Sequence, residues 1–166
     1  MKTITKDYKV YTYDELSKEA KERARQDWIE DDELSFLSDD MQYKADELVK
    51  EAGIKGDVSR VFYSLSYCQG DGAMFEGDFE WKDHNIKVRH SGHYYHENSK
   101  DIEMTKDGEW TDEKEQEFDA IYIDICQELA KYGYDCIETS QSEENIRETF
   151  LANDYTFLEN GEMFNN

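Results

Sequence analysis

All four histidines of this 166-residue chain lie within thirteen residues, at positions 84, 90, 93 and 96. Imidazole nitrogens bind zinc and related metals, so the spacing His90-x-x-His93-x-x-His96 suggests a metal site. On an extended strand, residues three apart point to opposite faces, and His90 and His93 would converge only if Ser91-Gly92 forms a turn or bulge. The sequence therefore leaves two interpretations open, a partly exposed histidine-rich strand and a metal-dependent enzyme.

Cys68 stands directly before the glycine-rich segment Gln69-Gly70-Asp71-Gly72. A nucleophilic cysteine needs a nearby histidine and an electropositive environment, and the acidic composition of this chain disfavours such a thiolate. The segment lacks the lysine of a phosphate-binding loop and the aspartate pattern of a calcium loop. We interpret it as a tight turn in which the glycines adopt positive φ. The three cysteines form no C-x-x-C motif and are expected to be reduced thiols of a cytosolic protein.

Carboxylates dominate the chemistry of the chain, with 41 acidic residues against 19 basic ones and a net charge of −22. Residues 111–166 alone hold 15 acidic and 3 basic residues, a net charge of −12. Such a field repels nucleic acids and anionic membranes and attracts basic proteins. Grooves that bind nucleic acid are lined with lysine and arginine, so a rigid row of carboxylates could occupy one. The competing interpretation is an ordinary solvated surface, typical of a very soluble or halophilic protein.

The residues predicted to bind such a partner lie on a long helix, in the segment that follows it and on one face of a strand. They are Asp112, Glu113, Glu115, Glu117, Asp119 and Asp124; Glu138, Glu143, Glu144 and Glu148; and Glu76, Asp78 and Glu80. No catalytic residue, metal ligand or cofactor is assigned, because paired carboxylates occur throughout the chain and none stands out as an acid–base pair.

A central hairpin over residues 58–81 is the clearest predicted element. Aromatic and aliphatic residues alternate with polar ones on both sides of the Gly-Asp-Gly turn, which is the pattern of half-buried strands. On the second strand Phe75, Gly77, Phe79 and Trp81 form one face, and Glu76, Asp78 and Glu80 form the other. This hairpin is expected to be the scaffold on which the helices pack.

Helices and further strands are predicted on both sides of that hairpin. A Thr12–Glu15 capping box starts a helix with an apolar stripe through Trp28, and Gly53 ends a second helix. The predicted ranges are an edge strand at 5–12, helices at 12–28, 36–52, 111–132 and 142–152, strands at 85–95, 102–104 and 134–138, and a hairpin at 155–164 around Asn160-Gly161. Gly133 is expected to end the long helix, and Lys106-Asp107-Gly108 to form a turn.

These elements predict a single α+β domain over residues 1–166. We expect an antiparallel β-meander of about four strands, packed against an N-terminal αα-hairpin and C-terminal helices, with a β-hairpin at the end. No apolar run approaches the length of a membrane span, and no apolar leader segment precedes the first helix.

Three segments resemble small phage and prophage proteins, some of which carry a loose antitoxin label. They are Y-T-Y-D-E-L-S-K-E-A-K-E-R-A-R at 11–25, S-Y-C-Q-G-D-G-A-M-F-E-G at 66–77 and N-D-Y-T-F-L-E-N-G-E-M-F at 153–164. The resemblance implies a phage or mobile-element protein acting in the host cytoplasm, and it transfers no catalytic residue. With the charge, it favours a non-enzymatic counter-defence protein that mimics nucleic acid in the groove of a host CRISPR effector or restriction enzyme. An antitoxin-like partner protein and a metal-dependent enzyme are the alternatives.

Overall fold

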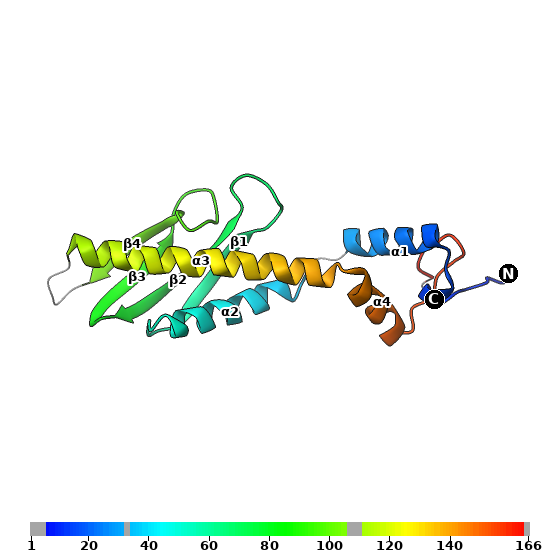
Figure 1. Cartoon of the computed structure of the whole chain (residues 1–166), viewed down its shortest axis with the longest axis horizontal. Helices are drawn as coiled ribbons and strands as arrows, with labels where there is room; N and C mark the ends of the chain where they lie inside the picture. The colour runs from blue at the N-terminus through cyan, green and yellow to red at the C-terminus, as the bar shows by residue number, and fades with distance from the viewer. Residues whose placement is uncertain (1–5, 32–33, 106–110, 165–166) are drawn as a thin grey trace, which may run out of the picture. The chain divides into compact units, whose positions relative to one another are not determined.

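The computed structural model describes residues 6–31, 34–105 and 111–164, and its helices and strands confirm the predicted α+β class (Figure 1). The chain divides into two compact units. Unit 1 combines Met1–Ser35 with Ile137–Asn166, and unit 2 is Phe36–Cys136. The expected single domain stays a prediction, since this division does not show whether either unit folds alone.

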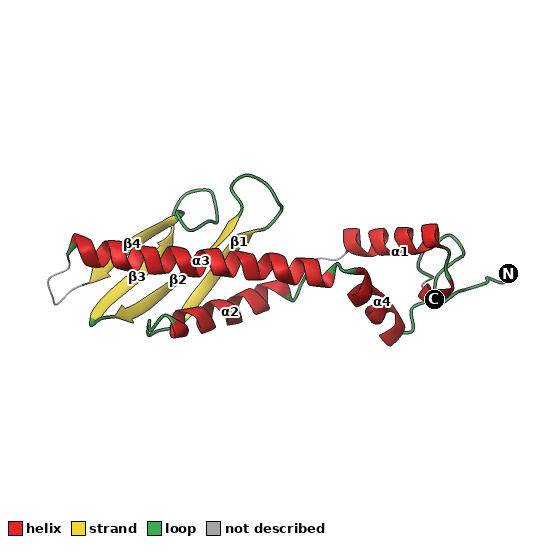
Figure 2. Cartoon of the chain, viewed as in Figure 1, coloured by secondary structure: helices red, strands yellow, loops and turns green. Residues whose placement is uncertain are grey.

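The centre of unit 2 is a four-stranded antiparallel sheet with the predicted meander order (Figure 2). Its strands are β1 (Val58–Ser64), β2 (Gly72–Trp81), β3 (His84–His90) and β4 (Lys100–Thr105). Neighbours in sequence pair throughout, with Val61 opposite Phe75 and Ile86 opposite Phe79. The third strand is shorter than predicted because it ends at His90, and residues 91–99 form a loop. The turn predicted at 106–108 lies outside the described residues.

One face of this sheet is covered by α2 (Leu37–Glu51) and by α3 (Asp112–Ser140), which runs across the strands (Figure 1). The residues predicted to share the inward face of β2 are buried, as are alternate residues of β3 and much of the inward side of both helices. These core residues include Phe75, Phe79, Trp81, Ile86, Val88, Met41, Ala45, Val49, Phe118, Tyr122 and Leu129. Of the two N-terminal helices, α2 packs on β1 in unit 2, and α1 belongs to unit 1.

The long helix does not end at Gly133, and the strand predicted at 134–138 is wrong because α3 continues to Ser140. A Cβ atom at position 133 would come within 2.5 Å of Leu65 Cδ1 and 2.9 Å of Met41 Sδ. The glycine therefore permits close packing of α3 against its neighbours, which is a different use of glycine from terminating a helix.

Unit 1 contains η1 (Tyr13–Glu15), α1 (Lys18–Asp31) and α4 (Glu143–Ala152). The predicted capping box is present, with the Thr12 N–H donating to Glu15 Oε2 at 2.8 Å. It caps only the short 3₁₀ helix, and α1 starts afresh where the Ala20 N–H donates to Ser17 Oγ at 3.2 Å. The predicted cap of α4 is confirmed, because Ser142 Oγ accepts from the Asn145 N–H.

The core of unit 1 is aromatic and joins both chain segments. It contains Tyr13, Leu16, Ala20, Ala24, Ile146, Phe150 and Phe157. Phe157 forms antiparallel bridges with Tyr11 and with Met163, and the turn at Gly161 has a φ of 88°. Of the predicted C-terminal hairpin, the bridge between Phe157 and Met163 is the part that forms. The predicted edge strand is wrong, since within residues 6–12 only Tyr11 pairs.

Candidate functional site

Five exposed carboxylates lie along one side of α3, and we call them the acidic stripe: Glu113, Glu117, Asp124, Glu128 and Asp135. They follow one another at spacings of four, seven, four and seven residues. Such spacings return to nearly the same side of an α-helix, turned away from the buried Tyr122 and Leu129. Lys131 is the basic residue that falls in this sector, and Glu117 Oε1 accepts from Lys82 Nζ at 2.6 Å.

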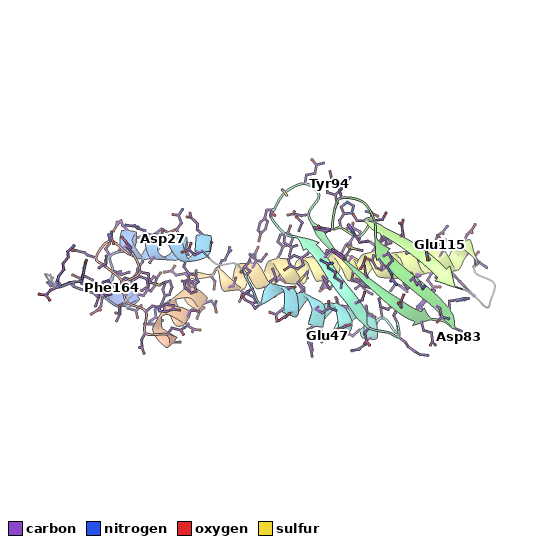
Figure 3. The ribbon with its side chains drawn as sticks, turned by 180° about the vertical axis from the view of Figure 1, so that it is seen from behind. Asp27, Glu47, Asp83, Tyr94, Glu115 and Phe164 are labelled. Carbon is purple, nitrogen blue, oxygen red and sulfur yellow. The ribbon has the colours of Figure 1, made fainter. Side chains whose placement is uncertain are left out.

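The other predicted acids of α3 lie on its flank. Asp119 Oδ1 pairs at 2.8 Å with Lys100 Nζ, whose side chain is only 7% exposed and which also lies 4.9 Å from the centre of the Tyr122 ring. Asp119 therefore balances a buried charge. Asp112, Glu115 (labelled in Figure 3) and Asp119 line a shallow hollow of about 430 Å³.

The acids of β2 lie on the outer face of the sheet as expected, but basic groups accompany them. Asp78 Oδ1 pairs with Arg89 at 2.7 Å, and Glu80 Oε1 pairs with Lys55 at 2.7 Å. Glu76 Oε1 accepts a hydrogen bond from the His90 backbone N–H at 2.7 Å. This face therefore carries mixed charge and is not a purely acidic surface.

The remaining predicted residues, Glu138, Glu143, Glu144 and Glu148, are exposed in unit 1. Glu143 and Glu144 occupy the first turn of α4, where the helix dipole favours acids. Glu144 and Glu148 flank Arg147, which makes a two-pronged contact with Asp14 at 2.7 and 2.6 Å. The predicted acids thus fall on both units, and a row of them is established only along α3.

Three of the four histidines have defined partners in the structure. His84 is buried, with Nε2 3.0 Å from Lys114 Nζ. His90 stacks on Phe62 and its Nε2–H donates to the Tyr94 carbonyl oxygen at 3.0 Å, while the His96 Nδ1 accepts from a backbone N–H. Within the described ranges, no group of three or more His, Cys, Asp or Glu side chains is placed to hold a metal ion. The geometry gives the metal-dependent alternative no support.

Asp71 organises the loop between β1 and β2 as a hydrogen-bond acceptor, a role that the sequence did not reveal. Its Oδ2 accepts from the Ser66 N–H at 2.6 Å, the Cys68 N–H at 3.0 Å and the Tyr134 hydroxyl at 2.8 Å. Its Oδ1 accepts from Ser64 Oγ at 2.8 Å and from the Cys68 thiol at 3.2 Å. The Asp71 hydrogen bond raises the pKa of Cys68, which keeps that exposed cysteine a thiol and makes it a poor nucleophile.

The ionisation of Asp71 leads to a prediction about pH. Partial burial acts to raise the pKa of Asp71, but the hydrogen bonds from Cys68, Tyr134 and Ser64 outweigh it and hold the pKa well below its usual range. A depressed carboxyl pKa stabilises the fold at every pH above its unfolded value of about 4, and the benefit is lost as the pH falls below that value.

We expect Asp71→Asn to melt at a lower temperature than the parent protein at pH 7, because an amide cannot accept all of these bonds. The difference in melting temperature should shrink steadily as the pH falls from 4 to 2. Thermal melts followed by circular dichroism across this range test it. A difference that stays constant with pH would contradict the assigned role of the carboxylate.

Comparisons with protein-family models, with curated proteins and with solved structures each found no match for this chain. No residue role can therefore be transferred from a relative. The case for function rests on the charge, the exposed geometry of α3 and the loops of unit 2. In the described part of the chain, no helix has the length and apolar character needed to cross a membrane.

Proposed function

We propose that this protein acts without catalysis, as an acidic binding protein that occupies the basic nucleic-acid groove of another protein. The partner class is a host defence nuclease, such as a CRISPR effector or a restriction enzyme, and the setting is a phage infecting that host. The observation that carries the proposal is the acidic stripe on α3. The partner's identity rests on the charge and on the resemblance of three sequence segments to phage proteins.

The charge density of α3 is of the order found in nucleic acid. Nine acidic residues and two lysines lie on this 29-residue helix. At a rise of about 1.5 Å per residue the helix is about 43 Å long, so it carries an acid about every 5 Å. One strand of DNA carries a phosphate about every 3.4 Å. The five carboxylates of the stripe span about 33 Å of this length, so a groove that faces the stripe would meet one about every 8 Å, about twice the spacing of phosphates along one strand.

The stripe is also presented rigidly. The opposite side of α3 is anchored in the core of unit 2 by Phe118, Tyr122 and Leu129, which are at most 1% exposed. Charges held on a packed helix need little ordering when a partner binds, so less of the binding energy is lost to entropy. This rigidity distinguishes the stripe from an acidic tail that only attracts a partner.

The antitoxin-like alternative places the contact on the basic first helix or on an aromatic patch, and the geometry of α1 does not favour the first of these. Arg23 lies 3.5 Å from Asp27 and 3.8 Å from Glu162, and Arg25 lies 3.2 Å from Glu22. These arginines are thus accompanied by acids of their own unit. Removal of the stripe charges separates the two functions, since contact through α1 predicts that partner binding is retained.

The test is competition with DNA. Purified restriction enzymes and CRISPR effectors would be bound to labelled DNA, and displacement by this protein measured at several salt concentrations. We expect displacement that weakens as salt rises. The triple variant Glu113→Gln, Asp124→Asn, Glu128→Gln should compete about threefold to a hundredfold less well, because each exposed charge pair contributes about 0.2–1 kcal/mol.

A matched control removes the same number of exposed charges elsewhere, through Glu19→Gln, Asp31→Asn and Glu159→Gln. This control variant should compete nearly as well as the parent protein. Equal losses in both variants would show a general charge effect and reject the stripe. If the protein displaces DNA from none of the nucleases in the panel, the proposed function is rejected.

A further inference from the structure

Two loops of unit 2 meet beside the sheet, the β1–β2 loop at 65–71 and the β3–β4 loop at 91–99, where Tyr94 stands out (Figures 1 and 3). Glycines allow this approach. A Cβ at Gly70 would lie 3.0 Å from the Tyr94 ring, and a Cβ at Gly72 would lie 2.7 Å from His96 Cβ. The two loops therefore form one packed structure, and the Asp71 hydrogen bonds hold one side of it.

Between the loops is a hollow of about 600 Å³. The residues that line it are Gln69, Gly70, Asp71, Tyr94, His96, Glu97 and Asn98. It therefore combines two carboxylates, two amides and an aromatic pair, and the lining includes no lysine or arginine.

We propose that this pocket binds the guanidinium group of an arginine side chain of the protein partner. The inference rests on the proposed function for the identity of that partner, a protein rich in arginine and lysine. The inference adds to the acidic stripe a second contact on unit 2, a pocket that recognises one type of side chain.

An aromatic face is the first requirement of a guanidinium site, and Tyr94 supplies it. The Tyr94 side chain is 59% exposed, and its ring lies nearly parallel to His96, with ring centres 5.7 Å apart and an interplanar angle of 20°. The His96 Nδ1 accepts from the Asn98 N–H at 3.1 Å, which fixes the imidazole beside the ring. A planar cation can stack on such a surface, and arginine does so more readily than lysine.

Acceptors for the guanidinium N–H groups are the second requirement. The carboxylate of Glu97 has no hydrogen-bond or ion-pair partner among the described residues, and its backbone oxygen accepts from Lys100 Nζ. Asp71 adds a negative charge, although its oxygens already accept five hydrogen bonds. Two carboxylates beside a ring attract a cation and repel a phosphate, which argues against a nucleotide in this pocket.

The probes are capped amino acids and a short peptide, titrated into isotope-labelled protein and followed by NMR. We expect N-acetyl-arginine amide and the peptide acetyl-Gly-Arg-Gly-amide to shift the backbone signals of Gly70, Tyr94, His96 and Asn98. N-acetyl-lysine amide should bind at least about threefold more weakly.

Three variants test the contacts. Tyr94→Ala and Glu97→Gln should each weaken arginine binding at least about fivefold, while Tyr94→Phe should retain it because the ring face remains. Equal binding of the lysine and arginine probes, or shifts that survive in Tyr94→Ala, would reduce the effect to general charge attraction and overturn the inference. An absence of shifts at the loops would overturn it too.

The result of the arginine titration is independent of the result of the DNA competition. The triple stripe variant should still bind the arginine probe at the loops with unchanged affinity. If the probe binds there but no nuclease releases its DNA, the proposed function fails and the pocket stands. If DNA is displaced but the probe leaves the loops unperturbed, the pocket fails and the proposed function stands.

Discussion

Replacing Tyr122 by phenylalanine should lower the free energy of unfolding by about 1–3 kcal/mol, although only one oxygen atom is removed. The Tyr122 hydroxyl donates to the Phe75 carbonyl oxygen at 2.8 Å and accepts from the Phe75 N–H at 3.1 Å. The pairing of β2 with β3 ends at Gly77, so Phe75 lies beyond the paired stretch. A helix side chain thus takes the place of a strand partner for two buried backbone groups.

The size of the effect follows from burial. Tyr122 is fully buried and Phe75 is 1% exposed, so the variant leaves a donor and an acceptor without water to replace the hydroxyl. Burial also raises the pKa of Tyr122 far above its usual range, which keeps the hydroxyl protonated and able to donate.

Urea denaturation gives the stability change, and hydrogen exchange of the Phe75 amide locates it. That amide should lose protection in Tyr122→Phe. The matched control is Tyr43→Phe, since Tyr43 is 74% exposed on α2 and its hydroxyl should contribute almost nothing. Equal stability changes in both variants would show that the hydroxyl of Tyr122 does not support β2.

Gly161→Ala should destabilise unit 1 by more than the usual cost of a left-handed alanine. Gly161 has a φ of 88°, where a side chain is strained by on the order of 1–3 kcal/mol. A Cβ there would also lie 2.2 Å from the Ala20 carbonyl oxygen and 2.9 Å from the Ala20 carbonyl carbon. These are backbone atoms of α1, so the contact is relieved only if the helix or the turn itself moves.

Gly53→Ala separates the two contributions, because Gly53 has a φ of 73° and no atom within 4 Å of the added Cβ. Both variants carry the backbone strain, and only Gly161→Ala adds the collision. We expect a clearly larger fall in melting temperature for Gly161→Ala, with a shifted indole signal of Trp28, which packs on Phe150 in unit 1. Similar falls in both variants would mean that the turn moves away from α1 at little cost.

The regular parts of this fold could be predicted from the sequence because they depend on periodic burial. The apolar stripe of α2, the alternation of β2 and the cap at Ser142 each depend on residues that are close together in the sequence. Gly133 could not be interpreted in that way. The same residue type ends helices and admits close packing, and only the positions of Leu65 and Met41 decide between the two uses.

The candidate site was predictable to a similar extent. Glu113, Glu117 and Asp124 followed from the charge and the helix pattern. Glu128 was missed although it lies inside the predicted helix, and Asp135 was missed because the helix was expected to end before it. The acidic face of β2 followed from alternation, whereas Lys55 and Arg89 come beside it through strand pairing and loop geometry. The close approach of the Tyr94 ring to Gly70 depends on two loops that are far apart in the sequence, so no local sequence pattern predicts it.

The contact between Met41 and the backbone of Gly133 has a consequence for how the chain ends are brought together. Unit 1 is assembled from segments separated by the whole of Phe36–Cys136. Closing an unstructured loop of about a hundred residues costs about 2 kcal/mol more entropy than closing one of about ten. Folded unit 2 holds residues near its two ends, Met41 and Gly133, against each other. Once unit 2 is folded, most of the entropy cost of bringing the two segments of unit 1 together has therefore already been met, and the aromatic core of unit 1 forms with a small additional loss of chain freedom.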